Sequence, residues 1–257
     1  MRVHRRIGEV DAAAPSPVLL WVHGGGHMLG EAAQDDPLLQ ALVSRTGCVC
    51  VAVDWRRSPE APYPAAMDDC YAATAWVVRS AGRLGIDPAH VVAGGASSGG
   101  GLAAGLALLV RDRGEVQLAG QVLVYPMLDD RESIASRLRV DHPRLWSNAS
   151  NRIGWASYLG ALSGDDVPAY AAPSRASDMA RLPPTWIGTG ELDLFRDEDI
   201  EYAARLMAAG VPTELHVYPR AVHGFDLFAP HTAVSRRFCR DRDDALDRFL
   251  TPQNARP

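Results

Sequence analysis

The chain has 257 residues, of which 47% are hydrophobic, and a formal net charge of −5 at pH 7. This length is sufficient for one large domain with a substantial core, and the acidic balance gives no reason to expect nucleic acid or an anionic membrane as a partner. The chain has no apolar run long enough to span a bilayer, no signal-peptide pattern, and no metal or disulfide spacing among its four cysteines, so we expect a cytoplasmic protein.

Strands and helices are expected to alternate along the chain. The strands are expected as apolar runs at 18–22, 48–53, a run starting at His90, 121–125, 185–190 and 214–218. The helices are expected over about 37–45, 65–84, a segment after Ser97 that continues to about Val110, about 197–209 and about 231–250. This alternation predicts an α/β fold with a mostly parallel sheet of about six to eight strands and helices on both faces.

Three stretches carry no strand pattern. Residues 1–17 are weakly patterned, and residues 54–64 are rich in proline and read as a loop. Residues 127–172 are rich in Arg, Ser, Asn and Trp, and we interpret them as a helical insertion that lies over the sheet. With no internal repeat and no linker, the whole chain, 1–257, is expected to form a single domain with 127–172 as its cap.

The strand that begins at His90 meets the sequence Gly95-Ala96-Ser97-Ser98-Gly99 and then an Ala/Leu-rich helical segment. Gly-x-Ser-x-Gly between a strand and a helix is the pattern of a nucleophile elbow. Ser97 is the candidate nucleophile, and Ser98 is not, because Ala96 occupies the position of its leading glycine. A glycine-rich turn that binds phosphate through backbone N–H groups is the alternative.

A second glycine-rich segment, His23 followed by glycines 24–26, comes directly after the first buried strand. Backbone without side chains can turn its N–H groups toward an oxyanion, and this motif forms the oxyanion hole of esterases. A glycine-rich turn without chemical importance is the alternative. We interpret His23 as a residue that organises the loop and leave the role of His27 undetermined.

The acid and the base of a triad are expected at the ends of later strands. In a parallel sheet, residues just beyond the carboxyl ends of the strands converge on one crevice. Asp193 follows the strand at 185–190, and His223 follows the strand at 214–218, in the order Ser, Asp, His that α/β-hydrolases use. His216 lies within a strand and is expected to be a packed or surface histidine. The rival carboxylates are Glu191 and the first-turn residues Asp197, Glu198 and Asp199.

Together these residues resemble the hormone-sensitive-lipase-like esterases, the bacterial family IV carboxylesterases of the α/β-hydrolase fold. The resemblance rests on His23-Gly-Gly-Gly, Asp54-Trp-Arg-Arg-Ser-Pro-Glu60, the Ser97 elbow, Asp193-Leu-Phe-Arg-Asp-Glu198 and His223-Gly-Phe225. It implies that Ser97 is the nucleophile, His223 the general base and acid, and Asp193 the residue that orients it. It also implies that the backbone N–H groups of Gly25, Gly26 and Ser98 bind the oxyanion.

Two features depart from the family pattern. Ala96 stands where the family usually has Asp or Thr, and Ser98 stands where it usually has Ala. Only 22 residues precede His23, whereas relatives usually carry a long N-terminal segment that forms part of a lid. We therefore expect a reduced cap built mainly from 127–172, a wider mouth and one strand fewer.

The resemblance implies hydrolysis of short- to medium-chain acyl esters, with a small-molecule ester as partner and with no metal or other cofactor. An amidase with the same triad, a ligand receptor on this fold that does not hydrolyse, and a truncated chain of low activity are the alternatives. Family members often dimerise through the edge strand near 213–218, so a homodimer is expected from the resemblance.

Overall fold

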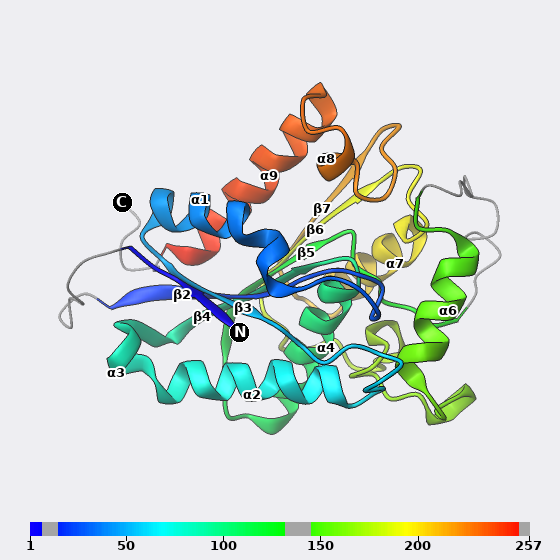
Figure 1. Cartoon of the computed structure of the whole chain (residues 1–257), viewed down its shortest axis with the longest axis horizontal. Helices are drawn as coiled ribbons and strands as arrows, with labels where there is room; N and C mark the ends of the chain where they lie inside the picture. The colour runs from blue at the N-terminus through cyan, green and yellow to red at the C-terminus, as the bar shows by residue number, and fades with distance from the viewer. Residues whose placement is uncertain (7–14, 132–144, 252–257) are drawn as a thin grey trace.

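The computed structural model describes residues 1–6, 15–131 and 145–251. Its centre is a seven-stranded sheet with the order β1-β3-β2-β4-β5-β6-β7 (Figure 1). The strands are β1 (Arg2–His4), β2 (Ser16–Val22), β3 (Val49–Val53), β4 (Ile86–Ala96), β5 (Leu118–Val124), β6 (Thr185–Gly190) and β7 (Thr213–Tyr218). All neighbouring pairs are parallel except β1 and β3, which are antiparallel.

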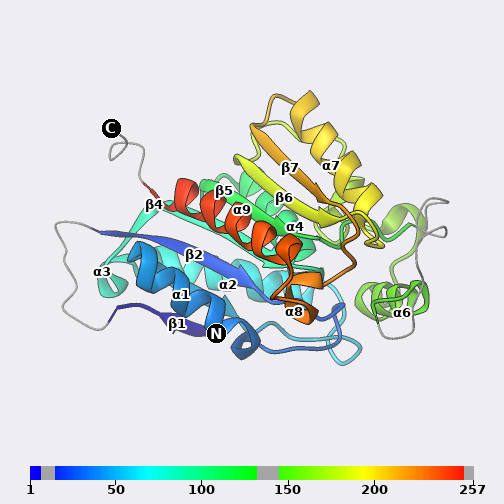
Figure 2. The ribbon, with the colours of Figure 1, turned by 90° about the horizontal axis from the view of Figure 1, so that it is seen from above.

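Helices cover both faces of the sheet (Figures 1 and 2). The longer helices are α1 (Asp36–Thr46), α2 (Ala65–Arg79), α4 (Ser98–Arg113), α6 (Asn148–Leu159), α7 (Arg196–Ala208) and α9 (Ala233–Leu250). The shorter helices are η1 (Ala32–Asp35), α3 (Ala81–Leu84), η2 (Gly164–Asp166), η3 (Pro173–Arg175) and α8 (Phe225–Phe228). Helices α1 and α9 pack on one face, and α2, α4 and α7 pack on the other.

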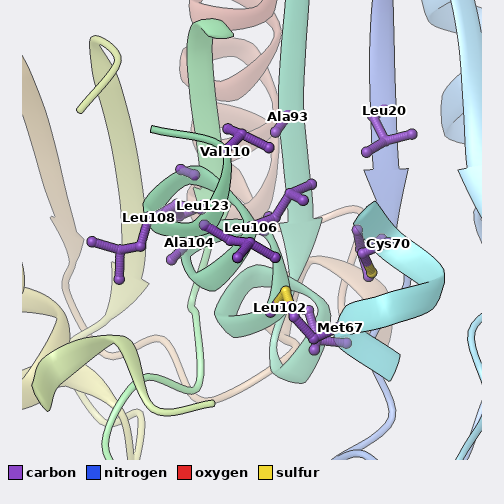
Figure 3. Close-up of a cluster of buried hydrophobic side chains, with 14 of the residues drawn as sticks. Leu20, Met67, Cys70, Ala93, Leu102, Ala104, Leu106, Leu108, Val110 and Leu123 are labelled. Atoms are coloured by element: carbon purple, nitrogen blue, oxygen red, sulfur yellow. The ribbon is translucent and has the colours of Figure 1, made fainter. Parts of the chain in front are cut away.

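Each face of the sheet has its own core because successive strand residues point to opposite sides. Leu20 of β2 belongs to the core beneath α2 and α4, together with Leu102 and Leu106 of α4 (Figure 3). Its neighbour Trp21 belongs to the other core, with Phe238 of α9. Both faces of the central strands are therefore buried, which explains their continuous apolar sequences.

The structure agrees with the predicted elements in order and type and differs at several boundaries. Residues 1–17 contain a strand, β1, which was not predicted because it has three residues with a largely exposed pattern. Strand β4 begins at Ile86 and continues through Asp87 and Pro88, which were expected to precede it. The helix predicted over 65–84 is divided at Ser80 into α2 and α3.

The predicted cap segment lies partly outside the described residues, since 132–144 are not among them. Its described part contains α6 and the 3-10 helix η2, and no strand. The sheet formed by the described residues contains seven strands, which is within the expected six to eight.

Candidate active site

Ser97 lies between the end of β4 and the start of α4, in a turn whose backbone is strained. Its φ is 56° and its ψ is −124°, a conformation that residues with a side chain rarely adopt. A Cβ on Gly95 would lie 2.3 Å from the carbonyl oxygen of Gly99, and a Cβ on Gly99 would lie 2.1 Å from that of Val22. Only glycine fits at either position, so both flanking glycines of the motif are required for the chain to turn here.

Three strand ends bring Ser97, His223 and Asp193 together. The Ser97 hydroxyl lies 3.0 Å from Nε2 of His223, and Nδ1 of His223 lies 2.9 Å from Oδ2 of Asp193. Asp193 is completely buried, whereas Ser97 is 8% exposed. The contact of Nδ1 with the carboxylate assigns the proton to Nδ1 and leaves Nε2 free to accept the proton of Ser97.

Two aromatic side chains pack against the His223 ring. Its centroid lies 4.7 Å from that of Tyr125 and 5.1 Å from that of Phe195, both in edge-on arrangements. The Phe195 N–H donates to Oδ1 of Asp193 at 3.0 Å, and the Tyr125 hydroxyl donates to Asp226 at 3.0 Å. Burial raises the pKa of Tyr125 well above its ordinary value, so this hydroxyl is a hydrogen-bond donor at neutral pH.

The glycine-rich loop lies beside the elbow. Gly25 and Gly26 have positive φ values of 139° and 59°, and a Cβ on Gly25 would lie 2.0 Å from the carbonyl oxygen of Leu29. Within the described ranges, the N–H groups of these two glycines have no backbone hydrogen-bond acceptor. Ser98 is the first residue of α4, so its N–H also has no intrahelical partner. Unpaired N–H groups near a nucleophile are suited to binding an anionic oxygen.

Both histidines of this loop are buried. His23 stacks on Trp55 with ring centroids 4.7 Å apart, and burial lowers its pKa. His27 stacks on Tyr158 of α6 at 3.9 Å, and burial lowers its pKa to about 3. Both rings are therefore neutral near neutral pH, and their packing connects the glycine-rich loop to neighbouring segments.

Within the described ranges, none of the rival carboxylates is hydrogen-bonded to or paired with His223. Glu191 accepts a hydrogen bond from the Arg220 N–H at 2.7 Å, and Asp197 pairs with Arg196 at 2.7 Å. His216 lies within β7, half-buried, with Nε2 2.6 Å from Glu214. The two other rival carboxylates belong to the first turn of α7, where Glu198 is half-buried and Asp199 is buried, and burial raises the pKa of each well above its ordinary value.

A cavity of about 430 Å³ opens directly on Ser97 and His223. One part of its wall is apolar and includes three side chains that are 62–69% exposed, Leu29, Leu227 and Phe228. Another part is polar and includes Asp35, Asp226 and Arg242, of which Asp35 accepts a hydrogen bond from the Trp21 indole at 2.8 Å. A cavity of this size accommodates a small organic molecule.

Sequence reasoning did not identify the residues that form this wall and hold the histidine. Tyr125 and Phe195 follow their strands at positions where aromatic residues are ordinary core components, so neither gave a separate signal. Trp146 of the predicted cap segment also lines the cavity, where it packs against Gly26. These contacts depend on tertiary packing that no local pattern encodes.

A cluster of metal-ligating side chains and a membrane-spanning helix are both absent from the described ranges. No group of three or more His, Cys, Asp or Glu side chains there is arranged to hold a metal ion. No helix there is long and apolar enough to cross a membrane. The four cysteines are free thiols, three of them buried.

Comparisons with known proteins agree with this architecture. Residues 19–227 match a family model described as the alpha/beta hydrolase fold. The chain is 39% identical over 218 residues to carboxylesterase NlhH and 37% identical over 214 residues to esterase LipI, both of Mycobacterium tuberculosis. The matches cover 83% and 82% of this chain but 67% and 66% of those proteins, so the chain spans about two thirds of their length.

Solved structures give the same result. The structure of a bacterial heroin esterase superposes with a TM-score of 0.90 at 45% identity, over 93% of this chain and 77% of that one. The fold and the strand-end constellation thus define an α/β-hydrolase. The chain belongs to the α/β-hydrolase family and, within it, to the hormone-sensitive-lipase-like, family IV group of carboxylesterases.

Proposed function

We propose that the chain is a serine carboxylesterase that hydrolyses short- to medium-chain acyl esters. The observation that carries this proposal is the connected geometry at the elbow. The Ser97 hydroxyl is 3.0 Å from a histidine nitrogen whose other nitrogen is 2.9 Å from a buried carboxylate. The cavity that opens on these groups supplies space for a small ester.

In the first half of the reaction, His223 Nε2 takes the Ser97 proton as Oγ attacks the ester carbonyl carbon. The carbonyl oxygen becomes an oxyanion that accepts hydrogen bonds from the N–H groups of Gly25, Gly26 and Ser98. Loss of one such donor typically lowers the rate by about a hundred- to a thousandfold. His223 then gives its proton to the leaving alcohol, and the acyl group remains bonded to Ser97 Oγ.

In the second half, water replaces the alcohol. His223 removes a proton from the water as its oxygen attacks the acyl carbonyl, and the same N–H groups bind the second oxyanion. The proton returns to Ser97 Oγ as the carboxylic acid leaves, so the enzyme is regenerated. Asp193 keeps the imidazole in the required tautomer and stabilises its protonated form throughout. Neither half of the proposed reaction requires a metal or other cofactor.

We propose that the cap segment 127–172 covers part of this site within a single domain. Its described part contacts the glycine-rich loop, because Trp146 packs against Gly26 and a Cβ on Gly154 would lie 2.8 Å from the Gly26 carbonyl oxygen. A cytoplasmic location and a homodimer through the edge strand β7 (Thr213–Tyr218) belong to the same proposal.

The test is hydrolysis of p-nitrophenyl esters from acetate to palmitate by the wild type and by Ser97→Ala. Loss of a triad serine can lower turnover by about a millionfold, so we expect hydrolysis of the shorter esters to fall to background in the variant. Ser44→Ala is the matched control, since that hydroxyl donates to the Gln40 carbonyl oxygen on α1.

Three outcomes would contradict the proposal. Equal activity of the wild type and Ser97→Ala would exclude Ser97 as nucleophile. A folded wild type that is inert on every ester but cleaves the corresponding anilides would indicate an amidase. A folded wild type that is inert on both would favour a ligand receptor, although all three triad side chains are present.

A further inference from the structure

Glu198 is a carboxylate close to the site that the proposed mechanism does not use. It belongs to the first turn of α7, five residues after Asp193, and it is half-buried. Its Oε1 accepts hydrogen bonds from the backbone N–H of Leu128 at 2.7 Å and of Asp129 at 3.2 Å. One carboxylate oxygen thus holds two consecutive N–H groups of the segment that follows β5.

That segment, residues 126–129, supports the nucleophile from behind. The N–H of Met127 donates to the carbonyl oxygen of Ser97 at 3.0 Å. The first turn of α4 is pressed against it, because a Cβ on Gly101 would lie 2.1 Å from the Met127 carbonyl oxygen, and one on Gly100 would lie 2.9 Å from Pro126. A displacement of 126–129 would therefore move the Ser97 backbone directly.

The backbone of Glu198 is close in sequence to the residues that orient His223. Between Asp193 and Glu198 lies Phe195, whose ring holds His223 and whose N–H bonds the Asp193 carboxylate. Glu198 therefore links two backbone segments. Residues 126–129 support Ser97, and residues 193–198 carry Asp193 and Phe195, which orient His223.

We propose that Glu198 is a positioning residue that fixes Ser97 relative to His223 by anchoring residues 126–129 to α7. This inference rests on the proposed triad and extends it to a residue that touches neither substrate nor the reacting atoms. The length of its side chain and its oxygen acceptor matter, and its negative charge does not.

The electrostatic surroundings agree with a role that does not need charge. Burial raises the pKa of Glu198 well above its ordinary value, and the nearby Asp129 and Asp193 raise it further, whereas the two N–H donors lower it. The adjacent Asp199, completely buried, has a strongly raised pKa for the same reason and is affected by the charges of Glu198 and Asp193. We therefore expect a neutral side chain with the same reach to be tolerated at position 198.

The experiment compares Glu198→Gln, which keeps the length and the oxygen, with Glu198→Asp, which keeps the charge but is shorter by one methylene. The readout is the rate at which a fluorophosphonate probe labels Ser97, measured beside kcat and KM for a p-nitrophenyl ester. Glu201→Gln and Glu201→Asp, on the exposed side of the same helix, are the matched controls.

We expect Glu198→Gln to label within about threefold of the wild type and Glu198→Asp to label at least about tenfold more slowly. A misplacement of about 1 Å at a reacting group can lower the rate by about a hundredfold. In Glu198→Asp, kcat should fall while KM changes little. In Glu198→Gln, the acid limb of the pH profile of kcat should keep its midpoint. Thermal unfolding of each variant separates a loss of folding from a loss of positioning.

Labelling by Glu198→Asp that equals or exceeds that of Glu198→Gln would overturn the inference, as would a folded Glu198→Asp with the wild-type rate. A wild type that the probe does not label would instead overturn the proposed triad, and the inference with it. The two failures are therefore distinguishable, because only the second removes reactivity from the unaltered protein.

Discussion

Ser97 is held by two regions of different construction. Behind it, backbone packs on backbone, since Gly95 and Gly99 lie against carbonyl oxygens at distances that no Cβ permits. At the catalytic histidine, side chain packs on side chain, since the His223 ring contacts the rings of Tyr125 and Phe195. The backbone contacts allow only glycine, whereas the side-chain contacts allow substitutions of similar shape. Substitutions in the first region should therefore destabilise the fold, and substitutions in the second should lower activity in a protein that remains folded.

The largest expected effect comes from the backbone region. In Gly99→Ala the new Cβ would lie 2.1 Å from the Val22 carbonyl oxygen and 2.4 Å from that of His23, and neither atom is on a flexible side chain. We expect destabilisation of at least about 3 kcal/mol and loss of activity, because insertion into tightly packed structure forces the backbone apart. Thermal and urea unfolding would measure it.

Gly82→Ala provides the control for that variant. A Cβ at Gly82 meets nothing within 4 Å and the residue lies in α3, so the change should be neutral or stabilising by up to about 1 kcal/mol. Wild-type stability of Gly99→Ala would show that the elbow is less tightly packed than described.

The next effect comes from the side-chain region. Asp193→Asn keeps the shape of the buried side chain but removes the acceptor that selects the His223 tautomer. We expect kcat for a p-nitrophenyl ester to fall by about ten thousandfold while the protein remains folded. Asp197→Asn, a change at a partly exposed carboxylate in the first turn of α7, should stay within a fewfold of the wild type, and an equal loss in both would exclude Asp193 as the orienting acid.

The smallest effect concerns His27, which stacks on Tyr158 and has a pKa of about 3. Its ordinary pKa is about 6.5, so the unfolded chain binds a proton between these two values and the folded chain does not. Stability is therefore lost as the pH falls below about 6.5, by about 2–3 kcal/mol from this residue at pH 4.5.

His27→Phe keeps the aromatic stacking and removes the titration. The free energy of unfolding of this variant should fall less between pH 7 and pH 4.5 than that of the wild type, by about 2–3 kcal/mol. His231→Gln, a change at an exposed histidine, is the matched control. An unchanged slope in His27→Phe would mean that His27 is accessible to protonation in the folded state.

The contrast between the two regions also explains what the sequence could predict. The elbow was predictable because its geometry permits only glycine at 95 and 99, and a steric requirement of this kind is visible as a residue type at a fixed spacing. The positions of Asp193 and His223 followed from the rule that strand ends converge in a parallel sheet. The strands themselves were predictable because burial on both faces makes their sequences continuously apolar.

The side-chain contacts could not be predicted in the same way. Glu198 has the sequence position of an ordinary first-turn carboxylate, and only the fold shows that it reaches the N–H groups of Leu128 and Asp129. The short strand β1 pairs with β3 through backbone hydrogen bonds that its exposed side chains do not reveal. Interactions between segments distant in sequence leave no local pattern, so these features appear only in three dimensions.

The most direct test of the account is to trap the covalent intermediate. The wild type would be mixed with p-nitrophenyl butyrate, quenched in acid within milliseconds, digested and analysed by mass spectrometry. We predict a burst of about one p-nitrophenol per active site and a butyryl group on Ser97, absent in Ser97→Ala. Turnover without a covalent adduct, or an adduct on Ser98 or any other residue, would contradict the assignment of Ser97 as the nucleophile.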